Sequence, residues 1–523
     1  MELTYIILLI LLLIYIPLYI HVRMRKGAKD SKIVAYGPFI MLKTSRGIEL
    51  LDGIAKYKRF WAAFGVISKI MAFFLMAMIM FILILDLVLL PTALSSPGIG
   101  VEYALAIPGL NPMLPLIYGL IGLIVAMVVH EMAHGIQTRA NDMKVESVGI
   151  LYGVVPVGAF VEPNEEQIKE CGRRPRSTMF AAGIAINLTM AIVVFLLMSI
   201  GMMGSLSSPH GDRAAVVNVI AGSPADDMGI TYSSIILNID SSPVATYDDL
   251  MDHSFTLDGT YSIDYLTSDG PRNASIYMGA YVDGIAKGSP AEKAGIQKSS
   301  FLVNIERISD GTSYPISNIR EFQWLMDVKN PDRLRSGEEV DVTYVPYTGG
   351  TLGTPDTKTV TLGSNGDRAF LGVTYSLSGF SFTTPNEILS VAKNPLHNSA
   401  SVSDAAYDAL SYIGAPFRGY SPIPQDLQWW YQSGVMSDDI FWVVVHTLFW
   451  IFWLNLVFAV TNALPAVPFD GGYLFMDGVG AIVDRTHKDA TPERREKITN
   501  SITSVVSYGM LLILLLVMVA LLI

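Results

Sequence analysis

Apolar residues along this chain gather in long uncharged blocks near both ends, and a polar block fills the middle. A helix needs about 20 mostly apolar residues to cross the hydrocarbon core of a bilayer. We therefore predict a polytopic α-helical membrane protein with about six transmembrane helices and an inserted α/β region. The predicted spans are roughly Leu3–Ile20, Ser68–Leu90, Met113–Gln137, Met179–Met203, Ile440–Ala463 and Ser504–Ile523.

Lysine and arginine are unevenly distributed over the loops between these spans. Residues 22–60 carry ten of them, residues 92–112 none, residues 138–177 six and residues 477–499 five. Because short cytoplasmic loops carry the excess of positive charge, this alternation places the basic loops in the cytoplasm and both termini outside. The polar region 204–435 is then extracytoplasmic, and we expect the plasma membrane of a prokaryote as the location.

Composition narrows the classes of function. Apolar residues make up 51% of the chain and charged residues 16%, against about 25% charged in soluble proteins. The net charge of −11 argues against nucleic-acid binding, which needs a basic face. The single cysteine, Cys171, excludes an intrachain disulfide and a thiolate-rich metal site.

The polar region contains an internal repeat. Residues 222–240 read GSPADDMGITYSSIILNID and residues 288–306 read GSPAEKAGIQKSSFLVNIE, so ten of nineteen positions are identical at an offset of 66 residues. A period of this length predicts two copies of one small domain, at 213–279 and 280–363, which are either spacers or peptide-binding modules. We expect residues 364–435 to form an extracytoplasmic linker with amphipathic or interfacial segments.

Aromatic residues directly precede the fifth span, at Trp429, Trp430 and Tyr431. Such residues are enriched where a membrane meets water, so we expect them to anchor the chain at the outer interface. The other parts of the chain are a first transmembrane helix with a cytoplasmic loop and the two parts of a membrane core: 1–60, 61–203 and 436–523.

Candidate chemistry begins at the end of the third span, which reads HEMAHG at residues 130–135. Positions i and i+4 share one face of a helix, so His130 and His134 can bind the same metal ion. Glu131 projects beside that ion, where it can accept a proton from water. Ionisable residues in a lipid-embedded helix are costly without a function, which favours a metal site over a pair of hydrogen-bonded core histidines.

A third ligand must come from another segment, because a catalytic zinc ion usually has three protein ligands and one open position. The fifth span runs into NALPAVPFDGG at 462–472, whose prolines and glycine pair prevent a regular helix. Irregular backbone at membrane depth is tolerated only where protein or a water-filled cavity covers it. Asp470 lies there, toward the cytoplasmic end of its span like the histidines. We predict that it is the third ligand; the alternative is a helix cap.

Together these motifs resemble the site-2 protease family of intramembrane zinc metalloproteases. PVGAFVEP at 156–163 is similar to the family's membrane-associated β-hairpin, and AAGIAINL at 181–188 is similar to its AGPxxN pattern. The repeat resembles the PDZ domains that many members carry on the extracytoplasmic side. The chain departs from the family at Ile184, where proline is usual, and at the Ser-Ser pairs 233–234 and 299–300, where bacterial relatives often have Gly-Asp.

The resemblance implies one catalytic Zn²⁺ and a proteolytic reaction. His130, His134 and Asp470 would hold the ion, and Glu131 would be the general base and later the general acid. The expected activity is hydrolysis of peptide bonds within or near the transmembrane segments of other proteins. The expected partners are single-span membrane proteins and the lipid bilayer.

The resemblance also implies residues that contact the substrate. Asn187 and Asn462 would contact the substrate backbone or the oxyanion. Gly158, Ala159 and Phe160 would pair with an unwound substrate as an added strand.

Three other functions share part of these features. A membrane-anchored PDZ-type scaffold would bind exposed peptides and have an inactive metal site, but an intact HExxH motif with Asp470 argues against decay. A membrane zinc hydrolase acting on lipidated peptide ends also uses HExxH, although nothing else here resembles it. A transporter is compatible with six spans, yet no inverted repeat of the spans is visible.

Overall fold

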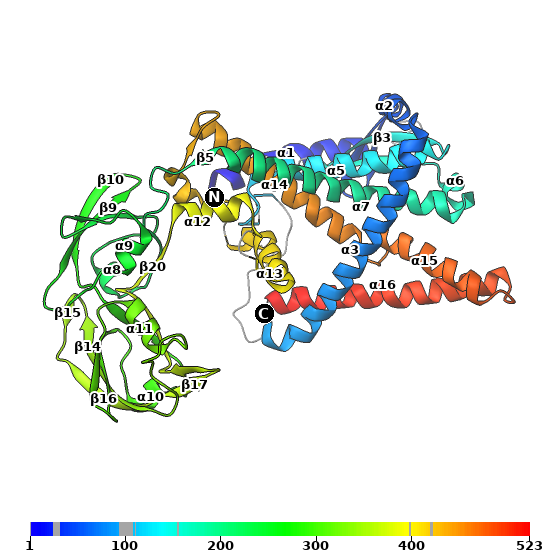
Figure 1. Ribbon diagram of the computed structural model, residues 1–523. Coiled ribbons are helices and arrows are strands. Elements are labelled where there is room, and N and C mark those ends of the chain that lie inside the picture. Colours follow the sequence, from blue (N-terminus) through cyan, green and yellow to red (C-terminus); the bar gives the residue numbers. More distant parts are fainter. Residues whose placement is uncertain are drawn as a thin grey trace. The chain divides into compact units, whose positions relative to one another are not determined.

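The computed structural model describes residues 2–24, 32–93, 108–109, 111–153, 156–396, 399–418 and 422–522. They form two compact units, one helical and one rich in strands (Figure 1). The helical unit comprises Met1–Met202, Ala409–Pro422 and Asp439–Ile523, and the strand-rich unit comprises Met203–Asp408 and Ile423–Asp438. The polar middle of the chain is thus inserted in the helical unit. Most of the loop 92–112, which has no lysine or arginine, lies outside the described residues.

The helical unit is built from long apolar helices. They are α1 (Glu2–Met24), α3 (Lys58–Ala93), α5 (Leu116–Ala140), α7 (Arg173–Leu196), α14 (Asp438–Asn462) and α16 (Pro492–Leu522). Among the described residues, α3, α5, α7 with its extension to Ser205, α14 and α16 are long and apolar enough to cross a membrane, so they are candidates for five of the six predicted spans. The described apolar part of α1, Leu9–Met24, is shorter, so the first span stays a prediction.

A four-stranded antiparallel sheet belongs to the helical unit. Its strands are β1 (Ile33–Tyr36), β2 (Phe39–Thr44), β3 (Val145–Tyr152) and β4 (Pro156–Pro163), in that spatial order. The sequence predicts only the hairpin that contains β4. Strand β2 comes from the loop before α3 and pairs with β3, with Leu42 opposite Ile150. Strand β4 lies at the edge of this sheet and contacts α5.

The chain interrupts its helix between α14 and α15 (Asp470–Thr486). Pro465 and Pro468 cause this break, because proline lacks the N–H group that a helix needs. Gly471 lets α15 begin directly against the preceding segment, since a Cβ atom there would lie 2.4 Å from the carbonyl oxygen of Ala463. The break therefore fixes the position of the first residue of α15, which is the predicted metal ligand.

Each copy of the repeat forms a strand, a short helix and a second strand. These are β6 (Ala215–Val219), α8 (Pro224–Asp227) and β7 (Ile235–Ile239) in the first copy, and β11 (Ala280–Ile285), α10 (Pro290–Ala294) and β12 (Ser300–Arg307) in the second. The copies continue with α9 (Tyr247–Met251), β9 (Tyr261–Thr267) and β10 (Gly270–Ile276), and with α11 (Ile319–Met326), β14 (Glu339–Thr348) and β16 (Asp356–Thr361). Each copy has its own hydrophobic core, around Ile236 in the first and Leu302 in the second.

Residues 364–435 are not a linker throughout, which corrects the predicted boundary. Strands β19 (Val373–Leu377) and β20 (Phe380–Thr383) form a hairpin, in which β19 pairs with β11 and β20 pairs with β6. Each copy therefore takes one strand from the chain that follows the second copy. The second copy is inserted within the first, and a single sheet joins both. Helices α12 (Pro385–Lys393) and α13 (Val402–Ile413) follow.

The expectation that Trp429, Trp430 and Tyr431 anchor at the membrane interface is wrong for the last two. Trp430 is 0% exposed and Tyr431 is 2% exposed. The indole N–H of Trp430 donates to the carbonyl oxygen of Ser233 at 2.9 Å. The hydroxyl of Tyr431 donates to the carbonyl oxygen of Pro385, also at 2.9 Å. Both rings belong to the interior of the strand-rich unit, where burial of a large aromatic surface is most favourable.

Candidate metal centre

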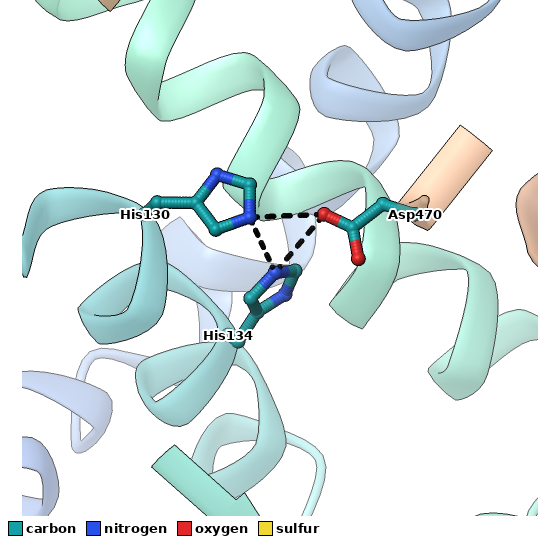
Figure 2. Close-up of side chains that lie close together, drawn as sticks. All are labelled: His130, His134 and Asp470. Atoms are coloured by element: carbon teal, nitrogen blue, oxygen red, sulfur yellow. Dashed lines mark hydrogen bonds and ion pairs between the residues drawn. The ribbon is translucent and has the colours of Figure 1, made fainter. Parts of the chain in front are cut away.

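Three side chains converge where α5 meets the start of α15 (Figure 2). His130 and His134 lie one turn apart on α5, and their Nε2 atoms are 3.1 Å apart. Each Nε2 atom also lies 3.1 Å from Oδ2 of Asp470. The structure thus brings the three predicted ligands together as a nearly equilateral triangle of largely buried atoms.

Hydrogen bonds on the far side of each imidazole decide which ring nitrogen carries the proton. Nδ1 of His134 lies 2.8 Å from the carbonyl oxygen of Met179, which can only accept, so this nitrogen carries the hydrogen. Nδ1 of His130 lies 2.6 Å from Oδ1 of Asn187, which accepts in the same way. In the neutral rings both Nε2 atoms therefore present lone pairs to the centre of the triangle.

Three electron-pair donors at this spacing fit a cation between them. Oδ2 of Asp470 is buried and accepts no hydrogen bond from the described residues. Ligand atoms about 2.0–2.1 Å from a tetrahedral zinc ion stand roughly 3.3 Å from one another. The separations of 3.1 Å observed here are close to that value. Two imidazole nitrogens and a carboxylate oxygen are also an established ligand set for catalytic zinc, so the residues present fit this ion.

Asn187 is oriented by bonds that keep its carbonyl oxygen toward His130. Its amide group donates to the carbonyl oxygen of Ala126 at 2.9 Å and to Oδ1 of Asn455 at 2.8 Å. Both asparagines are completely buried. In this structure Asn187 orients a ring, whereas the resemblance implies a contact with substrate. Asn455 is not among the site residues predicted above, although an asparagine in an apolar helix seven residues before Asn462 is a usable signal.

The amide of Asn462 is bonded within its own helix. It donates to the carbonyl oxygen of Phe458 at 3.1 Å, near the end of α14. The substrate contact implied for this residue therefore stays a prediction.

Gly183 on α7 packs directly against both imidazole rings. A Cβ atom at this position would lie 2.6 Å from Nε2 of His134 and 2.7 Å from Cε1 of His130. Non-bonded carbon atoms in contact stand about 3.5–4.0 Å apart, so a larger residue fits only if the rings move. This contact gives a physical reason for the glycine of AAGIAINL, which the sequence alone marks only by resemblance.

Strand β4 holds the carboxylate of Glu131, which lies on α5. Its Oε2 atom accepts a hydrogen bond from the backbone N–H of Val161 at 3.0 Å. Because successive N–H groups alternate between the two sides of a strand, the N–H of Ala159 points the same way as that of Val161. Gly158, Ala159 and Phe160, the residues predicted to pair with substrate, therefore lie on the strand whose outer edge holds the proposed base.

An HExxH helix whose histidines converge with a distant carboxylate, set among long apolar helices, is typical of membrane metallopeptidases. The sequence model of peptidase family M50 matches residues 118–513. The chain belongs to peptidase family M50, the site-2 protease family. The family is one of metalloproteases, and the three residues brought together in this chain fit one zinc ion.

Curated relatives are consistent with this assignment. An uncharacterized protein of Methanocaldococcus jannaschii is 28% identical over 262 residues, which are 49% of this chain and 66% of that protein. Proteins named "putative zinc metalloprotease" in Clostridium acetobutylicum and Clostridium perfringens are both 27% identical, over 24% and 26% of this chain. These two matches cover 42% and 45% of the relatives. The chain therefore spans less than two thirds of the length of the relatives that it matches.

Proposed function

We propose that this protein is an intramembrane zinc metalloprotease that hydrolyses peptide bonds within or near the transmembrane segments of membrane proteins. The observation that carries the proposal is the triangle of His130, His134 and Asp470 among apolar helices, with Glu131 on the same helix as the histidines. His130, His134 and Asp470 would hold a zinc ion, which would polarise a peptide carbonyl and lower the pKa of water at the site toward about 7.

Glu131 carries the proton in this mechanism. Its carboxylate takes a proton from the attacking water and returns it to the leaving amine, so that the C–N bond breaks and an acid and an amine form. The N–H of Val161 holds one carboxylate oxygen, which fixes the direction in which the other oxygen receives the proton. The Nδ1 bonds of His130 and His134 keep their Nε2 atoms directed inward throughout.

A helical substrate must unwind before it is cut, because its carbonyl groups are bonded within the helix. The outer edge of β4 supplies replacement hydrogen bonds to an extended segment, through the outward N–H and C=O groups of Ala159 between Gly158 and Phe160. The same edge holds Glu131, so a segment that adds to β4 runs alongside the base. This arrangement supports binding by strand addition.

We further propose single-span membrane proteins as substrates and the plasma membrane of a prokaryote as the location, with the site toward the cytoplasmic side. The apolar helices and the alternating basic loops support this arrangement. The two copies of the repeat would be PDZ-like domains outside the membrane, which admit a substrate only after its outer domain is trimmed. One substrate with and without a folded outer domain tests this filter. We expect the trimmed form to be cut faster, and equal rates would contradict the filter.

The cleavage itself is tested by incubating purified full-length protein with a panel of single-span substrates. We expect cuts within the membrane segment, mapped by mass spectrometry, that stop on zinc chelation. The Glu131→Gln variant should keep its zinc and lose the cleavage. Equal activity in that variant would remove the proposed base. A panel left uncut by zinc-loaded protein would favour the alternative, a PDZ-type scaffold with an inactive metal site.

A further inference from the structure

Helices α7 and α15 contact each other along one face of each helix, and this contact leads directly to the metal centre. Residues three, four or seven apart share a helix face, and the contact residues follow that spacing. From the side of the metal centre outward they are Phe180, Arg176 and Arg173 on α7, which contact Tyr473, Asp477 and Asp484 on α15 in that order. The numbers fall along one helix as they rise along the other, so the two helices are antiparallel.

An ion pair between Arg176, which is 22% exposed, and the buried Asp477 lies two turns of α15 beyond Asp470. Nε of Arg176 donates to both carboxylate oxygens of Asp477, at 3.1 and 3.2 Å, and Nη2 donates to Oδ1. The side chain of Asp477 is 4% exposed. Between this pair and the metal centre, the rings of Phe180 and Tyr473 stack with centroids 4.7 Å apart. A second ion pair, Arg173 with Asp484, lies farther along the same contact.

A buried ion pair contributes little net stability, because the cost of removing two charges from water offsets their attraction. Its forked geometry is nevertheless specific, since a guanidinium group and a carboxylate fit together in one alignment. An apolar contact between two helices lacks this specificity. A slip of one helical turn would move Asp470 by about 5.4 Å. A zinc–oxygen bond of about 2.0–2.2 Å tolerates no such slip.

We propose that Arg176 and Asp477 are positioning residues that fix the register of α15 against α7 and so hold Asp470 at the metal centre. This inference rests on the proposed zinc site, to which it adds the device that delivers the third ligand. Arg176 and Asp477 act through Asp470 and do not touch the metal. We therefore expect zinc binding to depend on the hydrogen-bonded ion pair of Arg176 and Asp477, and not on the packing of the two side chains.

The double variant Arg176→Met with Asp477→Leu separates these two roles, because apolar residues of similar size keep the packing and lose the fork. A matched control, Arg139→Met with Asp52→Leu, removes an ion pair between α5 and α2 (Arg46–Ala55) in the same helical unit. The reversed pair, Arg176→Asp with Asp477→Arg, restores the fork. Zinc affinity and thermal unfolding are measured for each full-length variant in detergent. The visible absorption of the Co²⁺-loaded protein reports whether the ion is four-coordinate.

We expect the Met/Leu variant to unfold like the wild type while its zinc affinity falls roughly ten- to a hundredfold. Its Co²⁺ absorption should weaken, as expected when the carboxylate ligand is lost. The control should bind zinc normally, and the reversed pair should recover most of the affinity. Normal zinc affinity and normal Co²⁺ absorption in the Met/Leu variant would overturn the inference.

Two other outcomes are equally decisive. If the Met/Leu variant fails to fold, the single substitution Asp477→Asn, which keeps the shape of the side chain, must lower zinc affinity in protein that is still folded by thermal unfolding. If it does not, the inference is wrong. A wild-type protein that binds no zinc would overturn the proposed function and this inference with it, whereas zinc binding that is indifferent to the fork overturns the inference alone.

Discussion

Replacing Gly183 with alanine tests the packing of the metal centre with a single methyl group. The added Cβ atom would lie 2.6 Å from Nε2 of His134 and 2.7 Å from Cε1 of His130. Normal contact needs about 3.5–4.0 Å, so the rings must retreat by roughly 1 Å. They cannot retreat freely, because their Nδ1 atoms are bonded to Asn187 and to the carbonyl group of Met179.

Two opposing terms set the effect of this substitution on stability. Alanine in place of glycine within a helix gains about 1 kcal/mol. Forcing a methyl group into a packed site costs about 1–3 kcal/mol. The net loss in the free energy of unfolding is therefore about 0–2 kcal/mol, so the protein remains folded. The displaced ligands should lower zinc affinity roughly ten- to a hundredfold.

Competition with a chelator measures this affinity on the full-length protein, and thermal unfolding measures the stability. The matched control is Gly201→Ala in the extension of α7, where the nearest atom to the new methyl group is Cδ1 of Leu197 at 3.6 Å. That distance is an ordinary contact, so the control should bind zinc normally. Normal zinc affinity in the Gly183→Ala variant would refute the reasoning, because the rings would then not need the space that glycine leaves.

Three further predictions test the hydrogen bonds around the site and the core of the strand-rich unit. Asn455→Leu removes the oxygen that accepts from the Asn187 amide and so orients Asn187 against His130. Zinc affinity should therefore fall about tenfold in equilibrium binding. An unchanged affinity would show that the His130 ring is held in place without Asn455. Val161→Pro removes the N–H that holds Glu131, so the cleavage rate should fall about tenfold or more with zinc content unchanged. Val161→Ala keeps the N–H and should cleave normally, and equal rates in both variants would contradict the role of β4. Trp430→Ala empties part of the strand-rich core and should lower the free energy of unfolding by about 3–5 kcal/mol in calorimetry; a loss below about 1 kcal/mol would contradict its burial.

The parts of the site that follow local patterns are predictable from the sequence. His130 and His134 are one helical turn apart in any helix, so their shared face needs no tertiary information. Asp470 is recognisable because it follows prolines that end an apolar span, at the depth of the histidines. The structure then places all three within one triangle, as that combination predicts.

The parts that depend on long-range pairing are not predictable in this way. Strand β2 lies in a basic loop far from β3 in the sequence, and nothing in its own residues names its partner. The pairing of the hairpin of β19 and β20 is equally hard to predict from the sequence, because its partners β11 and β6 lie in different copies of the repeat. Trp430 is ambiguous for another reason: an aromatic residue before an apolar span suits a membrane interface and a protein core equally well.

We propose that Asp470 completes a zinc site with His130 and His134 and that Glu131 is the base beside it. The most direct test is the zinc content of purified full-length protein, measured together with cleavage of a single-span substrate, for the wild type and the Asp470→Ala and Glu131→Gln variants. We predict one zinc ion per chain and cleavage in the wild type, zinc without cleavage in Glu131→Gln, and neither in Asp470→Ala. An Asp470→Ala variant that retains its zinc and cleaves at the wild-type rate would contradict the account.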